Sequence, residues 1–401
     1  MGSFCHSLAG GGSVTKSLVR GTHRLITPEA TVERIRPFMP VLGITRVANL
    51  TGLDAIGIPT VAVYRPNSRS LAVSQGKGLS LAAARASGLM ESLELFHAER
   101  IDLPLRFASC RELAANHRVV APADLPQPRG GLFHENLVLL WVEGLDLLHD
   151  QPVWLPFERV HLNSCLPLPA GSGCFSLDSN GLASGNHLLE AISHSLCELV
   201  ERDSLARFLA ESKAEQARRR LDVDTVKDVD CLDILGRYER AGVAVAVWEI
   251  TRAELGIPAF HCVILEREAD SPRAVGGSGG MGCHPTRHIA LLRALTEAAQ
   301  SRLTMISGAR DDLQRSRHEL IRAPDVLASL RADVLAETPV RSFAEAPSWE
   351  CPTLDGDVTW LLERLQAAGY DQVVMVDLTH PGLQIPVVRM AVPGLRGIVF
   401  H

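Results

Sequence analysis

The chain has 401 residues, 46% of them hydrophobic and 21% charged, which suits a globular protein with a large core. Its net charge of −6 lacks the excess of positive charge typical of proteins that bind nucleic acid, so we expect no nucleic-acid partner. Nine scattered cysteines show no zinc-type or disulfide-scaffold spacing, and no apolar run of about 18 residues could span a membrane. The N-terminus has no signal-peptide pattern, and together these features favour a cytoplasmic protein with reduced thiols.

The first part of the chain is rich in Gly and Ser over residues 1–15, which we expect to form a flexible N-terminal arm ahead of one domain over 16–401. Ser80 is a suitable N-cap for a long helix that reaches about residue 99. Before that helix the sequence predicts a short helix after Thr27, strands over 44–50 and 59–64, and a turn over 74–78.

Two more long helices, over 187–209 and 286–307, each follow a glycine-rich passage. Polar residues 309–350 predict a peripheral helical insert. The other expected elements are strands near 137–142, 154–156, 243–250, 258–265 and 373–377, helices over 211–229 and 358–368, a glycine-rich loop over 276–282 and an apolar segment near 385–392. Because strands and helices alternate, we expect an α/β (mixed α+β) fold, and we find no internal repeat.

The first long helix carries two carboxylates three residues apart, Glu91 and Glu94, and residues at this spacing share a helix face. At ~100° per residue, Ser87 falls with them in an arc of ~60°. Met90 and Leu95 flank this arc, which is unusual for a face that points to solvent. The helix therefore presents a polar stripe bordered by apolar residues.

The second long helix carries a similar stripe, in which Glu190, Glu198 and Glu201 share one side. Its opposite side is apolar, with Leu196 as an example. His194 lies within the acidic stripe, and we interpret it as a packing or supporting histidine rather than as a metal ligand.

One acidic pair alone would fit a solvated helix, because Glu is a good helix former. Two pairs, both behind glycine-rich turns and both bordered by apolar residues, favour a shared cleft. Carboxylates near apolar surface repel one another unless cations neutralise them, and Mg²⁺ prefers oxygen ligands and substrate phosphates. The sequence therefore predicts a nucleotide–Mg²⁺ site built by Glu91, Glu94, Glu198 and Glu201.

Two glycine-rich stretches could offer backbone N–H groups to phosphate, the loop over 276–282 and the turn containing Lys77. A flexible hairpin is the simpler interpretation of the first, since no Walker A sequence follows it. On the third helix Glu297 and Gln300 share a face, whereas Arg302 lies ~200° from Gln300 on a regular helix.

Other catalytic motifs are missing from the sequence, including a nucleophile elbow, a zinc-protease helix and a dinucleotide fingerprint. Cys174 could be a nucleophile, but a small loop cysteine is the simpler interpretation. A chain without a clear nucleophile suits phosphoryl transfer, in which the protein positions groups and neutralises charge.

At these residues the chain resembles the YcaO family of ATP-dependent enzymes that modify peptide backbones. The turn at Lys77 followed by Ser87, Glu91 and Glu94 is similar to the first family signature, although Leu95 replaces its usual next arginine. The second signature is matched by the run from Gly181 to Asn186 and then Glu190, Glu198, Glu201 and Arg202.

The third signature is matched by Gln300-x-Arg302. The surrounding helical run Ala294–Thr304, with the Ser307–Asp312 run after it, most resembles the subgroup that works with a TfuA partner. The resemblance covers roughly Lys16 to Leu395. It implies a YcaO fold with an ATP cleft between helices and sheet, often in a homodimer.

By this resemblance Glu91, Glu94, Glu198 and Glu201 would be the catalytic residues and hold Mg²⁺. The residues implied to contact ATP are Lys77, Ser87, Asn186, Glu190, Arg202, Gln300 and Arg302. ATP and Mg²⁺ are thus the expected cofactors.

The implied reaction activates a backbone amide of a ribosomally made peptide or protein by transfer of the ATP γ-phosphate to the amide oxygen. Thioamide formation, with a TfuA-like partner supplying sulfur, is favoured because the chain ends without the Pro-x-Pro-x-Pro tail of the azoline-forming branch. Two alternatives remain open: an azoline-forming cyclodehydratase and a peptide-binding scaffold without catalysis.

Overall fold

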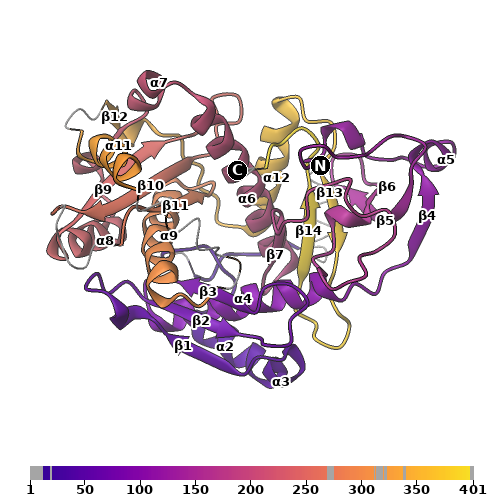
Figure 1. The fold of residues 1–401 in the computed structure, drawn as a ribbon, viewed down its shortest axis with the longest axis horizontal. Coiled ribbons are helices and arrows are strands. Elements are labelled where there is room, and N and C mark those ends of the chain that lie inside the picture. The colour runs from indigo at the N-terminus through magenta and orange to yellow at the C-terminus, as the bar shows by residue number, and fades with distance from the viewer. Residues whose placement is uncertain are drawn as a thin grey trace.

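The computed structural model describes residues 12–18, 20–268, 275–310, 312, 319, 323–336 and 340–397. Two three-stranded antiparallel sheets, β1-β2-β3 and β11-β10-β9, stand beside a six-stranded antiparallel sheet in the order β4-β5-β13-β14-β7, with β6 paired to β5 (Figure 1). A short parallel pair, β8 and β12, forms a separate sheet that packs beside β9. The expected mixed α/β class is confirmed.

The strands have the following bounds: β1 Arg46–Asn49, β2 Thr60–Tyr64, β3 Val73–Lys77, β4 Leu105–Ser109, β5 Val138–Asp146, β6 Gln151–Pro156, β7 Leu182–Ser184, β8 Leu221–Asp222, β9 Val243–Glu249, β10 Ala259–Glu266, β11 Ser278–Cys283, β12 Arg341–Ser342, β13 Val374–Asp377 and β14 Val387–Ala391. The helices are α2 Pro28–Ile35, α3 Met39–Leu42, α4 Leu81–Glu99, α5 Cys110–Ala114, α6 Leu188–Ala210, α7 Lys213–Ala217, α8 Val229–Arg240, α9 Arg287–Ser307, α11 Pro324–Leu335 and α12 Leu354–Ala367.

The three long helices begin and end close to the predicted residues because local signals mark them. Ser80 caps α4 by accepting the backbone N–H of Ala83, and His187 caps α6 in the same way with Leu189. Helix α9 ends at Gly308, whose φ of 55° lies in the left-handed region that favours glycine.

Two glycine-rich segments that the sequence predicts as a turn and a loop are instead strands β3 and β11, so both predictions are wrong. A Cβ on Gly76 would lie 2.0 Å from the carbonyl oxygen of Ala84 on α4. A Cβ on Gly280 would lie 2.3 Å from the carbonyl oxygen of Ala294 on α9. These glycines therefore serve close packing of a helix on a strand rather than loop flexibility.

Each three-stranded sheet is followed by a long helix, β3 by α4 and β11 by α9, so two units share one element order although their sequences show no repeat. Helix α6 lies at the centre of the molecule (Figure 1), where it packs on β7 and β14 on one side and on β11 on the other. This arrangement brings α4, α6 and α9 near one another.

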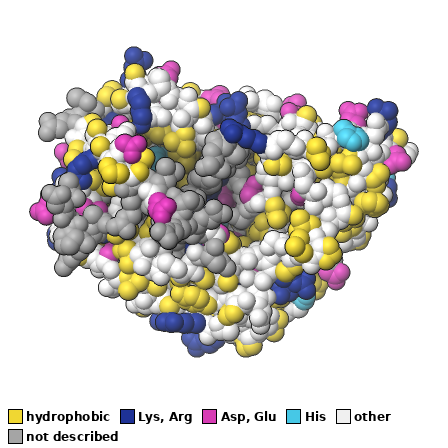
Figure 2. Space-filling model, viewed as in Figure 1, with side chains coloured by type: hydrophobic (Ala, Val, Ile, Leu, Met, Phe, Trp, Pro, Cys, Tyr) yellow, Lys and Arg dark blue, Asp and Glu magenta, His cyan; other side chains and the backbone are white. Residues whose placement is uncertain are grey.

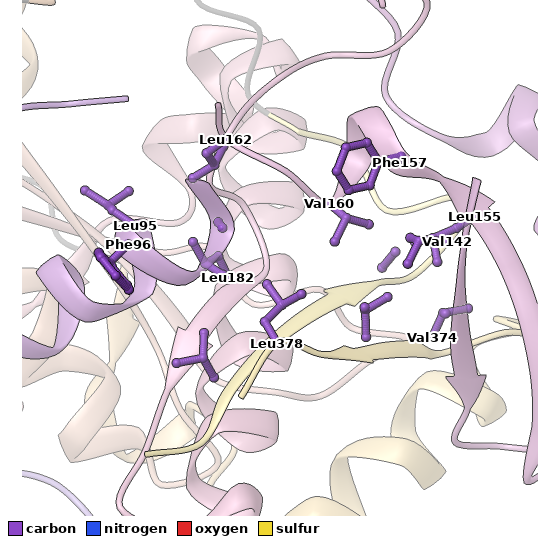
Figure 3. Packing of buried hydrophobic residues seen from close by; sticks show 14 of the residues in the cluster. Leu95, Phe96, Val142, Leu155, Phe157, Val160, Leu162, Leu182, Val374 and Leu378 are labelled. Atoms are coloured by element: carbon purple, nitrogen blue, oxygen red, sulfur yellow. The ribbon is translucent and has the colours of Figure 1, made fainter. Parts of the chain in front are cut away.

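A large apolar core anchors α4 to the six-stranded sheet. Figure 3 shows Leu95 and Phe96 of α4 beside Leu182, with Leu378 and Val374 of the β13–β14 region beyond them. The helices α6 and α12 share a second core, and α8 and α9 cover the β9–β11 sheet in a third. Because most of α6 is buried, the few side chains that it leaves partly exposed can line a binding site.

The predicted surface helix over 211–229 is wrong, since this segment divides into α7, β8 and the start of α8. Residues 1–11 of the expected N-terminal arm lie outside the described residues. Farther along, Ser13 and Val14 donate hydrogen bonds to Asp355 on α12. Within the expected insert 309–350, the described elements are α11, β12 and a short 3-10 turn.

Across the described residues, no helix combines the length and apolar character that crossing a bilayer requires.

Candidate active site

A stripe on α6 is the first feature of the site. From Leu189 to Leu205 every residue is buried except three at four-residue spacing: His194, Glu198 and Arg202. Residues at this spacing lie on one face of a helix. The face is therefore an opening in an otherwise closed packing surface, as the apolar borders of the sequence pattern predicted.

Helix α4 brings the second pair of carboxylates, each fixed through one oxygen. Glu91 accepts the backbone N–H of Gln75 on β3 at 2.9 Å. Glu94 accepts the N–H and the hydroxyl of Ser184 on β7 at 2.8 and 2.6 Å. The second oxygen of each carboxylate accepts no hydrogen bond from the described residues, so it remains available to a ligand.

The four glutamates share one buried electrostatic environment. Burial raises the pKa of Glu94 to about 8, with the negative charges of Glu91 and Glu198 adding to the effect. Burial likewise raises the pKa of Glu198 to about 7 and that of Glu201 to about 8. The pKa of Glu91 is raised for the same reason. Because these groups act on one another, the structure brings together the four predicted metal ligands.

A fifth carboxylate, Glu297 of α9, belongs to the same cluster, and the sequence analysis did not assign it a role. It pairs with the Lys77 ammonium at 2.8 Å and accepts the backbone N–H of Met281 at 3.3 Å. Burial would raise the pKa of Glu297, but the positive charges of Lys77 and Arg202 outweigh burial and lower it. Its shared face with Gln300 was the available sequence signal.

The residues expected to bind ATP are distributed unevenly around this cluster. Ser87 is exposed on the α4 stripe, and Gln300 is partly exposed on the α9 face that carries Glu297. Arg202 lies 3.8 Å from Glu198, and its positive charge opposes the rise in the pKa of that carboxyl. These three residues adjoin the glutamates, as does Lys77.

Asn186 and Glu190 lie at the N-terminal end of α6 and are engaged with protein groups. Glu190 is buried and accepts the backbone N–H groups of Leu25 and Asn186 at 2.5 and 2.9 Å. The side-chain amide of Asn186 donates to the hydroxyl of Thr31, while its side-chain oxygen Oδ1 is buried without a partner among the described residues. That oxygen is a polar atom left for a ligand to satisfy.

Arg302 pairs with two carboxylates that are not members of this cluster, Glu266 and Asp54. Its guanidinium lies 2.5 Å from Glu266 and 3.4 Å from Asp54, and all three side chains are buried. Arg302 is buried whereas Gln300 is partly exposed, as expected for residues on different faces of α9. Contact between Arg302 and ATP stays a prediction from the resemblance.

The donor set fits divalent cations and a nucleotide. Within the described residues neither Glu198 nor Glu201 accepts a hydrogen bond, and, in addition to burial, the negative charge of Glu297 raises the pKa of both. Buried carboxylates without donors are costly unless cations neutralise them, and carboxylate oxygens are the ligands that Mg²⁺ prefers. In Figure 2 this face of the molecule is hollowed near its centre, and acidic side chains line part of the hollow.

Comparison with solved structures shows the fold. The chain is similar to a heterocyclase solved with substrate and cofactor, at a TM-score of 0.78 and 24% identity, covering 96% of this chain and 54% of that one. It therefore spans about half of that heterocyclase. It is also similar to YcaO from Methanopyrus kandleri, bound with AMPPCP and Mg²⁺, at a TM-score of 0.75 and 23% identity over 95% and 94% of the two chains.

Two curated relatives are similar over most of the chain. An uncharacterized protein in the tfuA 3′ region of Rhizobium leguminosarum bv. trifolii is 35% identical over 93% of this chain and 88% of that protein. An uncharacterized protein of Methanothermobacter thermautotrophicus is 32% identical over 92% and 94%.

The family model for YcaO cyclodehydratases, described as ATP- and Mg²⁺-binding, matches residues 75–396, which confirms the expected cofactors. The similarity to the protein of the tfuA region supports the TfuA-associated subgroup. The match covers all the predicted signatures and most of the fold. The chain therefore belongs to the YcaO family.

Proposed function

We propose that this protein uses ATP and Mg²⁺ to convert a backbone amide of a peptide or protein into a thioamide, with a TfuA-like partner supplying the sulfur. The observation that carries the proposal is the convergence of four partly or fully buried carboxylates, Glu91, Glu94, Glu198 and Glu201, whose pKa values are all raised. The relative in the tfuA region supports the choice of thioamide over azoline.

The proposed reaction exchanges the amide oxygen for sulfur and uses one ATP. The hydrosulfide sulfur bonds to the amide carbon, the amide oxygen bonds to the γ-phosphorus, and the bond from that phosphorus to ADP breaks. The carbon–oxygen bond then breaks, and oxygen leaves as phosphate with the hydrosulfide proton. Peptide, hydrosulfide and ATP thus give thioamide peptide, ADP and phosphate.

The residues of the chain would position and neutralise rather than form covalent bonds. Bound Mg²⁺ would reduce the negative charge of the phosphates and stabilise charge that develops on the transferred group. Glu198 and Glu201 on α6 would hold ions from one side of the cleft, and Glu91 and Glu94 on α4 from the other. Lys77 would add a point charge near the phosphates.

The cellular compartment and the protein partners complete the proposal. The described cysteines are free thiols, which suits the reducing cytosol in which we place the protein. A homodimer and the TfuA-like partner are part of the same proposal and rest on the family resemblance.

The test incubates the protein with a candidate peptide encoded beside its gene, Mg²⁺-ATP and sulfide, with and without the TfuA-like partner. We expect peptide-dependent ADP formation and a peptide mass that gains sulfur for oxygen. Loss of water from the peptide would identify the azoline-forming alternative. Tight Mg²⁺-ATP binding that survives Glu198→Gln and Glu201→Gln, without ADP formation, would identify a scaffold.

A further inference from the structure

Arg293, on the partly exposed face of α9, is a cation without a carboxylate partner among the described residues. Its guanidinium donates to the carbonyl of Cys283 at 2.9 Å and lies 3.4 Å from Nδ1 of His194. Lys77, by contrast, does have a carboxylate partner, Glu297. A half-buried guanidinium whose partners among the described residues, a carbonyl and a neutral histidine, are both uncharged carries excess positive charge, which favours a bound anion.

The contact between Arg293 and His194 fixes the role of each histidine nitrogen. A guanidinium donates hydrogen bonds and does not accept them, so Nδ1 of His194 is the acceptor and Nε2 carries the proton. Burial lowers the pKa of His194 well below 6.5, and the charges of Arg293, Arg24 and Lys77 lower it further. The neutral ring then presents an Nε2–H donor, which no described residue accepts.

A third basic group, Arg24, approaches from the N-terminal segment. It lies 3.9 Å from Glu190, but both oxygens of that carboxylate already accept backbone N–H groups. Burial lowers the pKa of Arg24, the Glu190 charge opposes this, and Arg293 lowers it further. The two arginines are therefore close enough to repel each other at the same end of the cleft.

We propose that His194 and Arg293 form an anion subsite that receives the polyphosphate of the nucleotide, a role that rests on the proposed function. His194 precedes Glu198 by one turn on the same face of α6, a rise of about 6 Å. An anion held by His194 and Arg293 thus reaches the carboxylate cluster one turn away. The cleft has a cationic half for the phosphates and an anionic half for metal ions.

The test measures binding of Mg²⁺-AMPPCP, a non-hydrolysable ATP analogue, by calorimetry. We expect Arg293→Met to weaken binding about tenfold, since a charge-assisted contact is lost. His194→Leu should weaken it about fivefold, and His194→Gln should recover most of that loss because its amide N–H replaces Nε2–H. Affinity for adenosine, which has no phosphate, should not change.

Matched controls replace residues away from the cleft. Arg237→Met removes an arginine of α8 that pairs with Asp233, and His161→Leu removes a buried histidine that stacks on Phe157. Both should bind Mg²⁺-AMPPCP like the unmodified protein. Thermal melting of each variant establishes that it is folded at the temperature of the titration.

Unchanged Mg²⁺-AMPPCP affinity in folded Arg293→Met and His194→Leu would overturn the subsite. A His194→Gln variant as weak as His194→Leu would assign His194 to packing instead. If the unmodified protein does not bind Mg²⁺-AMPPCP, the proposed function fails, and titration with inorganic tripolyphosphate then tests the subsite alone. Loss of tripolyphosphate binding in Arg293→Met would uphold it, and retention would overturn it.

Discussion

Lys77 of β3 lies 2.8 Å from Glu297 of α9, so one ion pair connects the first three-stranded sheet to the helix that covers the second. Both side chains are 22% exposed at the wall of the carboxylate cluster. Glu297 also raises the pKa of Glu201 on α6 through its negative charge, after the larger effect of burial. The pair thus couples three elements that build the site.

Replacement of Lys77 by Met should affect nucleotide binding more than stability. A partly exposed ion pair contributes about 1 kcal/mol to folding, so the melting temperature should fall only slightly. Mg²⁺-AMPPCP affinity should fall about tenfold, because a charged donor near the phosphates is lost and Glu297 is left unpaired. Calorimetry and thermal melting on the same preparation separate the two effects. A large fall in melting temperature with full nucleotide affinity would contradict this prediction.

Charge removal at the proposed metal-binding carboxylates should cause little loss of stability and a large loss of nucleotide binding. Glu201→Gln relieves repulsion in the metal-free protein, so thermal stability should hold or rise. The same variant should lose most Mg²⁺-dependent nucleotide binding and all peptide-dependent ADP formation. Glu239→Gln, on α8 outside the cluster, is the control and should change neither. Retained Mg²⁺-dependent binding in Glu201→Gln would count against its role as a ligand.

The raised pKa values predict a pH dependence of stability. Glu94 and Glu201, at about 8, and Glu198, at about 7, retain protons in the folded chain that the unfolded chain releases near its ordinary value of 4.5. The folded state then binds more protons, so these groups favour folding most below pH 4.5. Their contribution is lost as the pH rises towards 8.

Denaturant unfolding in the presence of a chelator measures this dependence. We expect the free energy of unfolding of the unmodified protein to fall between pH 5 and pH 8 more steeply than that of Glu198→Gln/Glu201→Gln. Saturating Mg²⁺-ATP should flatten the profile. Parallel profiles for the two proteins would show that these carboxylates do not titrate as described.

Much of the fold could be predicted from local signals. The Ser80 cap and the periodicity of α4, α6 and α9 place the long helices correctly. The errors at β3 and β11 have one cause, since glycine is typical of both a turn and a strand on which a helix backbone packs closely. Whether such a glycine forms a turn or a strand depends on contacts between residues far apart in the sequence, such as Gly280 and Ala294. The local sequence does not reveal these contacts.

The candidate site could be predicted in part. The i, i+3 spacing of Glu91 and Glu94 and the apolar border of the stripe indicated a shared cleft, and the structure brings the glutamates together. Glu297, Arg293 and His194 were missed as partners, because their meeting depends on α6 packing beside α9. Sequence periodicity reports the face of one helix but not which helix lies opposite.

The close packing of α9 on β11 can be tested with neighbouring glycines. Gly280→Ala places a Cβ 2.3 Å from backbone atoms of Ala294 and Ala298, so the helix must shift. We expect a loss of about 2 kcal/mol or more in the free energy of unfolding. Gly279→Ala, whose nearest contact is a His261 ring atom at 3.5 Å, is the control and should be near neutral. Equal effects at both positions would exclude the packing explanation.

Arg302 provides a test that separates structure from nucleotide binding. Arg302→Met leaves Glu266 and Asp54 buried without their guanidinium, which should cost about 3 kcal/mol of stability. Addition of Glu266→Gln should recover part of this loss. From the geometry we expect the folded variant to bind Mg²⁺-AMPPCP within twofold of the unmodified protein, whereas the family resemblance implies weaker binding. Calorimetry below the melting temperature decides between them.

The most direct measurement follows the amide oxygen. A candidate peptide carrying a heavy oxygen isotope at its backbone carbonyls is incubated with the protein, Mg²⁺-ATP and sulfide, and the released phosphate is analysed by mass spectrometry. Activation by phosphorylation of the amide oxygen predicts that the label leaves the peptide and appears in phosphate in proportion to the thioamide formed. Phosphate that contains none of the label, while the label stays in the peptide, would contradict the account.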